Sequence, residues 1–481
     1  MIVGTPPSQT PRTRLGEAVS RLARAHPGKS GVFALRDGQD AFAARALLAE
    51  AADRTLDVQY YIWRHDLSGT LLLAALRRAA DRGVRVRLLL DDNNTSGLDA
   101  VLASLDAHPN VEVWLFNPFR NRRFRAWGFL TDFSRLNRRM HNKSFTADGE
   151  VTIIGGRNVG DEYFGAGQGV LFVDVDVLAA GPVAAEVSGD FERYWASGSS
   201  VPAARVLPRA TPGAIRDLSQ VPSATERRAM EYVGAVARAP FVRDLFAGRL
   251  PLEWATVTML SDDPAKGLAR APYRAYLWPR LEPMVRPSRE LRLVSAYFVP
   301  TAEGVKFLVA QARRGVKIAI LTNALEATDV AVVHAGYAKW RKPLLRAGVE
   351  LWEIRRSSAG PRIKDRPVTG SSGSSLHAKT LSVDGSRLFV GSFNFDPRSA
   401  RLNTELGFVI DSPRLARAGA EAFAARVAAH AYQVRLSRAG RLQWVEEAEG
   451  KTRVHRREPG AGVWLRLAVW GLSKLPIEWL L

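Results

Sequence analysis

Cysteine is absent from the 481-residue sequence, which excludes disulfides, thiolate nucleophiles and zinc sites with cysteine ligands. The sequence also lacks any run of about 18 uncharged apolar residues, and its first residues lack the apolar core of a signal peptide. We therefore expect no membrane-spanning segment. Acidic residues are too few to balance the basic ones: 48 Asp and Glu face 68 Lys and Arg, giving a net charge of +20 and a pI near 10.6. This charge favours an anionic partner, either nucleic acid or an acidic lipid surface.

An internal repeat is the most informative feature that is present. The stretch RRMHNKSFTADGEVTIIGGRN (138–158) is matched by SSLHAKTLSVDGSRLFVGSFN (374–394). In each copy a His and a Lys two residues apart precede an Asp-Gly pair, an apolar run, two small residues and an Asn. Chance could supply one such match but not five in register, so the chain uses one unit twice. The matched residues are His141, Lys143, Asp148, Gly155 and Asn158 in the first copy and His377, Lys379, Asp384, Gly391 and Asn394 in the second.

The segments before both motifs have the pattern of an α/β unit. LDVQYYIW (56–63) and LVSAYFV (293–299) are apolar strand patterns, each followed by a helical pattern and a second strand. VEVWLF (111–116) and VELWEI (349–354) supply a third strand. We expect an α/β fold of two pseudo-symmetric α/β/α halves with one active site at their interface.

Composition and pattern also suggest how the chain is divided. A long segment between the halves, with a helical pattern at 224–246 and a strand pattern in WATVTML (254–260), would let the halves face each other about a pseudo-twofold axis. The expected parts are an N-terminal tail (1–30), a first domain (31–200), a connector (201–286), a second domain (287–430) and a C-terminal hairpin with an amphipathic tail (431–481).

Each motif can be interpreted as local geometry. Alternate side chains of a strand share a face, so His141 and Lys143 are expected about 7 Å apart on one surface. Asp148-Gly149 has the sequence of a two-residue hairpin turn, as does Asp384-Gly385, which gives both Asp residues a structural role. Each Asn can donate two hydrogen bonds. Small residues on the returning strands permit close approach of another group: Gly155, Gly156, Gly391 and Ser392.

A pair of each of these groups suits a phosphodiester. Lys143 and Lys379 would neutralise the nonbridging oxygens, one His would attack phosphorus, and the other would protonate the departing oxygen. Asn158 and Asn394 would add hydrogen bonds. None of these roles needs a metal ion or an organic cofactor, and we expect neither.

Both copies resemble the signature of the phospholipase D superfamily, HxKxxxxD followed by a Gly-Ser-x-Asn element, except that Gly156 stands where the first Ser would be. Longer stretches, such as 34–63 and GSFNFDPRSARLNTELG (391–407), are similar to bacterial cardiolipin synthases, the C type most closely. The resemblance implies phosphatidyl transfer in two steps through a phosphohistidine intermediate. It favours His141 as nucleophile and His377 as acid and then base, while the internal symmetry leaves the reverse assignment open.

Each His also needs an acceptor for its second ring nitrogen. Glu405 follows His377 in the second half, and aligning the two halves places Asp174 at the equivalent point of the first. Asp176 shares the strand face of Asp174 and is the alternative. A purely structural interpretation makes these residues edge-strand carboxylates facing water.

Two segments bear on the choice between lipid and nucleic acid. FNPFRNRRFRAWGFLTDFSRLNRRMH (116–141) interleaves aromatic residues with arginines, which fits base stacking, an anionic lipid interface or a helix packed on the core. VWLRLAVWGLSKLPIEWLL (463–481) fits a segment on a membrane surface or a terminal helix docked on the protein's own core. Single-strand binding has no use for such a tail, so we favour an anionic phospholipid membrane and expect no nucleic-acid partner.

The expected function is therefore cardiolipin synthesis by a peripheral enzyme of the bacterial cytoplasmic (inner) membrane. The phosphatidyl donor would be phosphatidylglycerol or phosphatidylethanolamine, and the acceptor phosphatidylglycerol. The alternatives are a hydrolytic phospholipase D and a nucleic-acid phosphodiesterase of the same superfamily.

Overall fold

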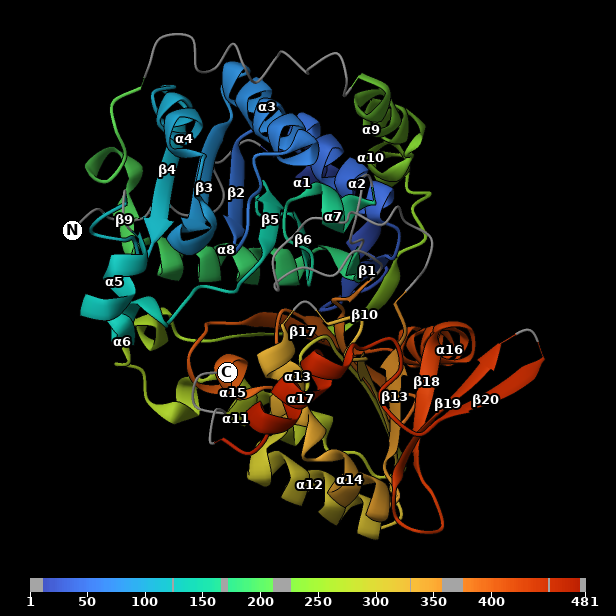
Figure 1. Cartoon of the computed structure of the whole chain (residues 1–481). Helices are drawn as coiled ribbons and strands as arrows, with labels where there is room; N and C mark the ends of the chain where they lie inside the picture. The colour runs from blue at the N-terminus through green and yellow to red at the C-terminus, as the bar shows by residue number, and fades with distance from the viewer. Residues whose placement is uncertain are drawn as a thin grey trace.

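The two α/β halves lie one above the other in the computed structural model, with the N-terminal half in blue to green and the C-terminal half in yellow to red (Figure 1). Residues 12–122, 125–165, 172–210, 226–328, 330–356, 375–448 and 450–475 are described. Each half contains a mixed sheet covered by helices. The expected α/β class with two related halves is confirmed.

The sheet of the first half has the strand order β9-β4-β3-β2-β5-β6-β8-β1, in which β2, β3 and β4 run parallel and the other neighbours are antiparallel. Helix α2 packs beside α3, and α8 lies against β2, β5, β6 and β8. The strands are β1 (Ser30–Leu35), β2 (Thr55–Tyr60), β3 (Arg85–Asp91), β4 (Val111–Phe116), β5 (Ser144–Ala147), β6 (Val151–Gly155), β8 (Asp176–Ala180) and β9 (Ser200–Pro202). The longer helices are α2 (Gly38–Ala51), α3 (Leu67–Asp81), α4 (Asp99–Asp106) and α8 (Pro182–Trp195).

The second half repeats this order as β10-β17-β16-β15-β11-β12-β13, with β18, β19 and β20 added at the far edge. As in the first half, three neighbouring strands, β11, β12 and β13, run parallel. The strands are β10 (Glu253–Ser261), β11 (Glu290–Ser295), β12 (Lys317–Asn323), β13 (Glu350–Ile354), β15 (Lys379–Val383), β16 (Arg387–Gly391), β17 (Leu406–Asp411), β18 (Ala431–Leu436), β19 (Leu442–Ala448) and β20 (Lys451–His455). The longer helices are α12 (Thr301–Arg313), α13 (Ala331–Ala338) and α16 (Pro413–His430).

Strand β10 joins the two sheets into one. Its first residues pair with β1, where Trp254 faces Gly31, and its later residues pair with β17. It therefore takes the place in the second half that β1 takes in the first. The strand expected in WATVTML is present, as are helices in the expected region, α9 (Glu226–Arg238) and α10 (Phe241–Phe246). The strand predicted within the connector is thus the one that joins the two sheets.

The segment expected as an N-terminal tail contains helix α1 (Arg14–Ala23). Thr13 caps this helix, because its Oγ1 accepts a hydrogen bond from the backbone N–H of Gly16 at 3.0 Å. Leu15 and Val19 lie on one helical face and are buried in the first-half core. This part of the segment therefore packs on the first-half core.

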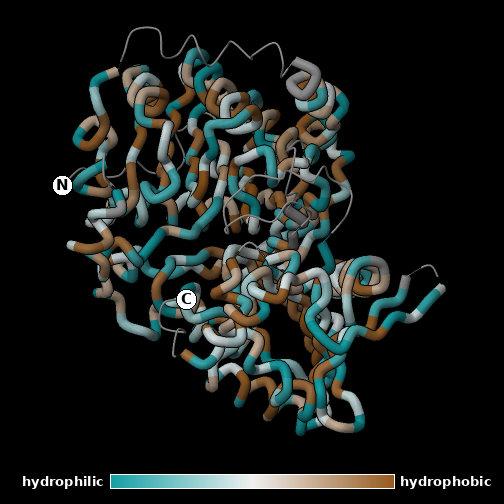
Figure 2. Tube along the Cα trace, in the orientation of Figure 1, coloured by the Kyte–Doolittle hydropathy of each residue, from teal (hydrophilic) through white to brown (hydrophobic). Residues whose placement is uncertain are grey.

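Hydrophobic residues follow the central strands of each half (Figure 2). The first half and the second half each have their own core cluster. A third cluster lies between them and takes residues from both sides, including Ile154 and Val177 from the first half and Phe408 and Ile410 from the second. The contact between halves is therefore itself a hydrophobic core, which fixes how the two motifs face each other.

The Asp of each motif holds its hairpin to the start of the preceding central strand. Asp148 has φ of 54° and accepts hydrogen bonds from the backbone N–H groups of Asp53, Arg54 and Thr55 at 3.0, 2.8 and 2.9 Å. Asp384 has the same φ and accepts the equivalent bonds from residues 288–290. These geometries support the structural role predicted for both residues.

Replacing this carboxylate should destabilise the fold. Asn has nearly the same shape as Asp and also tolerates a positive φ. Its side-chain NH₂ group would, however, face at least one of the backbone N–H donors, so we expect the free energy of unfolding to fall by about 1–3 kcal/mol. Chemical denaturation monitored by circular dichroism measures it. The exposed Asp81→Asn serves as control and should change stability by less than about 0.5 kcal/mol. Equal stability of the two variants would contradict the assigned role.

Candidate active site

Both His-Lys motifs lie at the boundary between the halves, and the backbone of each motif pairs with the opposite half. The His141 N–H donates to the Thr404 carbonyl at 2.9 Å, and the Thr404 N–H donates to the Arg139 carbonyl at 3.0 Å. In the second copy, β14 (Ser375–Leu376) pairs with β7 (Phe172–Val173). His141 and Lys143 thus precede β5 instead of lying within it, which corrects the strand placement. The reason is that this backbone is bonded across the interface.

Each imidazole is bonded to a carboxylate from the other half. His141 Nδ1 lies 2.8 Å from Glu405 Oε2, and His377 Nδ1 lies 2.5 Å from Asp174 Oδ2. Both carboxylates are buried. Asp176, the alternative acceptor, forms an ion pair with Arg45 at 2.7 Å instead. The structure therefore places Glu405 and Asp174 where an orienting acceptor is needed, in a crossed arrangement.

The absence of Ser at position 156 has a steric explanation. A Cβ atom on Gly156 would lie 2.2 Å from Asp174 Oδ1. In the second half, Ser392 occupies the equivalent position, and its Oγ donates to Glu405 and accepts from the Leu406 N–H. The Asp174 carboxylate that contacts His377 thus occupies the space that a Ser side chain at position 156 would fill.

Close approach also explains the other small residues of the motifs. A Cβ on Gly155 would lie 2.2 Å from Asp176 Oδ1, and a Cβ on Gly391 would lie 2.5 Å from the Leu406 carbonyl oxygen. Neither neighbour can move freely, because both lie in the adjacent strands of the sheet. Gly155 therefore allows β6 to lie close to β8, and Gly391 allows β16 to lie close to β17.

The two motif lysines are buried beside their histidines. Lys143 Nζ donates to the His141 carbonyl at 2.6 Å, and Lys379 Nζ bonds the His377 carbonyl and lies 3.0 Å from His377 Nδ1. Each Lys is only 2% exposed. An ammonium group has three N–H donors, so each can bind a phosphate oxygen while keeping its carbonyl contact.

The two asparagines differ in their surroundings. Asn158 Oδ1 accepts from the Ile62 N–H at 3.1 Å, and its Nδ2 donates to the Tyr163 hydroxyl at 3.0 Å. Asn394 Oδ1 is buried and has no hydrogen-bond partner among the described residues. The first amide is therefore held mainly by its own half, while the second retains an unused acceptor.

Several neighbours of the motifs were not predicted as site residues. The ring of Tyr61 meets His141 edge-on with centroids 4.9 Å apart, and Tyr163 meets His377 in the same way at 5.2 Å. Asp262, at the end of β10, accepts hydrogen bonds from the Glu405 N–H and from Lys266 Nζ, both at 2.9 Å. Tyr61 matches Tyr297 at the same sequence offset as the motif residues, which was a usable signal. No sequence pattern pointed to Asp262.

Burial and positive charge keep the imidazoles neutral. Burial, together with Lys143, Lys379 and Arg398, lowers the pKa of His141 well below its usual value. Burial and Lys379 also lower the pKa of His377, against the opposing effect of Asp174. Lysines of both halves act on each His, which indicates one shared site.

The two orienting carboxylates are not equivalent. Burial raises the pKa of Glu405 although Lys143 and Ser392 oppose it. Burial acts in the same direction on Asp174, but its contact with His377 and the nearby Lys379 outweigh it and lower the pKa. Asp174 therefore supports a positive charge on His377 better than Glu405 does on His141.

The C-terminal segment combines both interpretations of it. Helix α17 (Val463–Leu472) packs on α13, with Val469 buried beside Val299 and Ala335. Its other face exposes Trp464 (84%) and Trp470 (65%). The tail is thus docked on the protein and also presents an apolar outer surface. Residues 476–481 lie outside the described part.

The basic aromatic segment forms two short helices, α5 (Arg125–Thr131) and α6 (Phe133–Leu136). Arg122 and Arg125 turn inward to Asp92, whereas the side chains of three apolar residues are exposed: Trp127 (64%), Leu130 (78%) and Phe133 (42%). Phe124 lies outside the described residues.

Neither a metal cluster nor a spanning helix is found in the described ranges. No group of three or more His, Asp or Glu side chains there is placed to hold a metal ion. No helix in the same ranges is both long enough and apolar enough to cross a membrane.

The family model for the phospholipase D-like domain of cardiolipin synthase matches residues 45–195 and 283–427. Cardiolipin synthase C of Escherichia coli is 53% identical over 97% of this chain and 100% of its own length. An uncharacterised Helicobacter pylori protein is 32% identical over 87% of this chain and 84% of its own length. The chain belongs to the cardiolipin synthase family of phospholipase D-like phosphatidyltransferases.

The crystal structure of a phosphatidylserine synthase from Haemophilus influenzae has the same fold, with a TM-score of 0.60 at 13% sequence identity, covering 97% of this chain and 99% of that one. The family expected from the paired motifs is thus confirmed by the sequence comparisons, and the fold by the structural comparison.

Filling the space at Gly156 should disable the site. Gly156→Ser places a Cβ where Asp174 Oδ1 now lies, so the carboxylate must leave His377. We expect turnover to fall by about 10- to 100-fold, which is the loss typical when a metal-binding histidine loses the hydrogen-bond acceptor that orients it. Gly189→Ser is the control, because nothing lies within 4 Å of a Cβ there. Wild-type turnover in Gly156→Ser, with the fold intact, would show that the Asp174 contact is dispensable.

The lowered pKa of His141 predicts that catalytic activity persists into the acid range. The nucleophile must be neutral, and its pKa lies below the usual 6.5, so kcat/KM should be lost only as pH falls well below 6.5. Arg398→Gln removes one cation that lowers this pKa and should move the acid limb to higher pH. Rates on bis(p-nitrophenyl) phosphate between pH 4 and 8 measure it. Arg417→Gln, on the exposed face of α16, should leave the limb unmoved; a downward shift for Arg398→Gln would refute the assignment.

Proposed function

We propose that this protein makes cardiolipin by moving a phosphatidyl group from one phospholipid to the hydroxyl of phosphatidylglycerol, through a phosphohistidine on His141. The observation that carries the proposal is the pair of crossed His-carboxylate contacts beside two buried lysines. The identity to a relative named cardiolipin synthase C supports the same reaction. The donor is phosphatidylglycerol or phosphatidylethanolamine.

The first step cleaves the donor. Because Nδ1 of His141 donates to Glu405, Nε2 carries the lone pair that attacks phosphorus. His377 Nε2 gives its proton to the departing oxygen, which leaves as glycerol when the donor is phosphatidylglycerol. Lys143 and Lys379 stabilise the charge on the nonbridging oxygens in the transition state.

The second step reverses these roles. His377, now neutral, takes the proton from the hydroxyl of the acceptor phosphatidylglycerol, and the resulting oxygen nucleophile displaces His141 from phosphorus. When cardiolipin has formed and is still bound, His141 is again neutral and His377 is again protonated. The bonds and protons balance without a further reactant.

The two carboxylates differ in pKa: burial raises that of Glu405, whereas the contact with His377 lowers that of Asp174. The resemblance of the motifs to the phospholipase D superfamily favours His141 as nucleophile, and the adduct experiment distinguishes this assignment from its reverse. A bound phosphodiester adds a negative charge, which raises the pKa of both imidazoles and allows His377 to carry its proton in the complex.

The proposal is tested with purified protein and phosphatidylglycerol vesicles, with and without phosphatidylethanolamine. EDTA is present throughout, since the lysines are assigned the charge neutralisation. Mass spectrometry should find cardiolipin, together with released glycerol when phosphatidylglycerol is the donor, and His377→Ala should form none. Phosphatidic acid as the main product would show a hydrolytic phospholipase D. Cleavage of single-stranded oligonucleotides with no cardiolipin would show a nuclease.

We further propose that the outer face of α17 holds the enzyme at an anionic membrane surface on the cytoplasmic side. The exposed Trp464 and Trp470 would enter the lipid interface, while the net charge of +20 attracts acidic headgroups. Val469 and its neighbours keep the helix attached to α13.

Removing both indole rings should release the protein from lipid without harming the site. We expect Trp464→Ser/Trp470→Ser to lower affinity for phosphatidylglycerol vesicles by about 10-fold or more, because each ring buries a large apolar area. Vesicle sedimentation measures it, and hydrolysis of bis(p-nitrophenyl) phosphate should be unchanged. The control is Met230→Ser, which removes a similarly exposed apolar side chain (71%) on α9. Equal binding of both variants would exclude α17 as the contact.

A further inference from the structure

Helices α5 and α6 together form an elbow (residues 125–136) that presents apolar side chains to solvent. Figure 1 shows both helices at the edge of the molecule, at the level where the two halves meet. Trp127 and Leu130 are three residues apart and therefore share one side of α5, and Phe133 begins α6. All three side chains are exposed, Leu130 most of all. We call these three residues the elbow face.

The opposite side of the elbow is packed on the first half. The rings of Phe129 and Phe119 meet edge-on with centroids 5.6 Å apart, and Phe119 is buried. Leu136 is buried as well, and a Cβ on Gly128 would lie 2.9 Å from its Cδ1. The inner side of the elbow therefore has its apolar partners within the chain, whereas the elbow face stays open to solvent.

Three arginines of the elbow and its approach hold it in place. Arg122 pairs with Asp92, and Arg125 donates to the Asp92 carbonyl at 2.8 Å. Arg135 donates to the side chain of Asn117 at 3.1 Å. Both Asp92 and Asn117 are buried. A groove for single-stranded nucleic acid presents cations and aromatic rings together on its surface. Here these cations bind buried groups and apolar side chains face outward, which suits lipid better than nucleic acid.

The elbow is joined directly to the first motif. Helix α6 ends at Leu136, and residues 137–140 connect it to His141. In this connection the Asn137 carbonyl accepts a hydrogen bond from Arg398 at 2.9 Å, and the charge of Arg398 lowers the pKa of His141. The elbow is therefore a close neighbour of the reacting groups, in sequence and in space.

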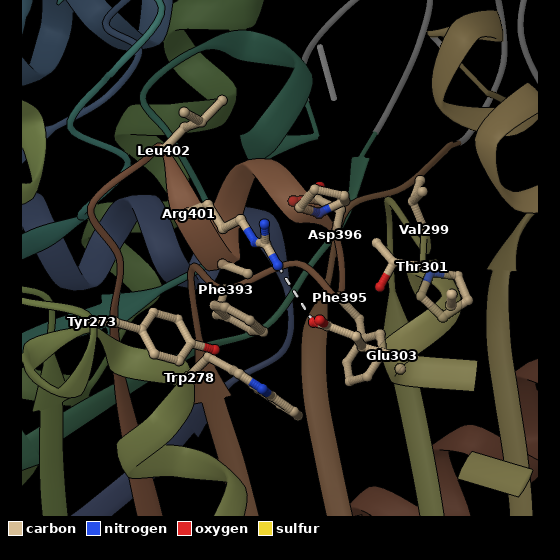
Figure 3. Close-up of a pocket in the computed structure, with 15 residues that line it drawn as sticks. Tyr273, Trp278, Val299, Thr301, Glu303, Phe393, Phe395, Asp396, Arg401 and Leu402 are labelled. Carbon is tan, nitrogen blue, oxygen red and sulfur yellow. Dashed lines mark hydrogen bonds and ion pairs between the residues drawn. The ribbon is translucent and has the colours of Figure 1, made fainter. Parts of the chain in front are cut away.

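The surface becomes polar where the elbow meets the second half. Arg138 donates to the Arg401 carbonyl at 3.2 Å. Arg401 also forms an exposed ion pair with Glu303 at 3.4 Å, in the lining of a pocket of about 560 Å³ that includes the exposed Tyr273 (Figure 3). Apolar side chains next to Arg and Tyr are typical of segments in a bilayer interface, where the polar ends of Arg and Tyr stay at headgroup level.

We propose that the elbow face enters the interfacial region of a phospholipid bilayer and gives the first half its own membrane contact beside the active site. The inference rests on the proposed function, because its occupant is the membrane that contains the substrate. It is separate from the contact proposed for α17, which belongs to the second half. Entry into lipid removes the exposed apolar side chains from water at the point where a phospholipid must approach His141.

Charge favours the same occupant. The chain carries a net charge of +20, and Arg120, just before the elbow, is exposed. Asp132 is the only acidic residue in the sequence between positions 117 and 147, and it is paired with Arg135 at 2.6 Å. The elbow therefore brings no unpaired carboxylate to an anionic lipid surface.

The absence of native cysteine allows a direct test. Leu130→Cys is labelled with a nitrobenzoxadiazole fluorophore, and Met230→Cys, at a similarly exposed position on α9, is the matched control. Each labelled protein is mixed with phosphatidylglycerol vesicles whose acyl chains carry a nitroxide quencher. We expect the label at position 130 to lose most of its fluorescence, because it lies at the boundary of headgroups and chains. The label at position 230 should keep its fluorescence and stay open to quenching by iodide in the water.

Serine variants measure the size of the contact. Trp127→Ser/Leu130→Ser should bind phosphatidylglycerol vesicles about 10-fold or more weakly than the wild type, because two large apolar side chains no longer leave water on binding. Met230→Ser should bind as the wild type does. Vesicle sedimentation measures both, and equal binding of the two variants would overturn the inference.

The labelled proteins also separate the remaining outcomes. A label at position 130 that stays unquenched on sedimented vesicles would overturn the inference, as would equal quenching of both labels or failure to bind the vesicles. Protection of that label from iodide without vesicles, by higher protein concentration or by a single-stranded oligonucleotide, would assign the elbow face to a second copy or to nucleic acid instead. None of these measurements needs turnover. A wild type that forms no cardiolipin would therefore reject the proposed function, while the quenching still decides the membrane contact.

Discussion

The crossed contacts between each imidazole and the carboxylate of the other half are the constraint on which the rest of the structure depends. His141 is held by Glu405 and His377 by Asp174, so neither half contains a complete site. The two halves must therefore pack against each other within the narrow distance range of a hydrogen bond. The continuous sheet through β10, the hydrophobic cluster between the halves and the backbone bonds at Thr404 all serve this purpose.

The same interface concentrates charge out of water. Two lysines, two histidines and two carboxylates are buried together, and such a group is stable only when each charge has a partner. Burial and the lysines lower the pKa of both imidazoles in the absence of substrate. An entering phosphodiester supplies the missing negative charge, so the site is matched to an anion and gains its proton donor when that anion binds.

The sequence was sufficient for the parts that depend on local pattern and on the repeat. The two halves, the strand in WATVTML and the hairpin turns at Asp148 and Asp384 follow from alternation, turn residues and register. The crossing of Glu405 and Asp174 was not predictable, because it depends on how two halves pack. The same holds for Gly156, whose missing side chain has meaning only once Asp174 is seen beside it.

Identification of the phosphorylated residue is the most direct test of the account, since every role assigned above follows from His141 being the nucleophile. The enzyme is mixed with phosphatidylglycerol, quenched within one turnover, digested and mapped by mass spectrometry for a phosphatidyl adduct. The account predicts the adduct on His141 in the wild type. In His377→Ala, an activated donor whose leaving group needs no general acid should give the same adduct on His141, and it should accumulate because the base of the second step is missing. An adduct on His377, or product formed by His141→Ala, would contradict it.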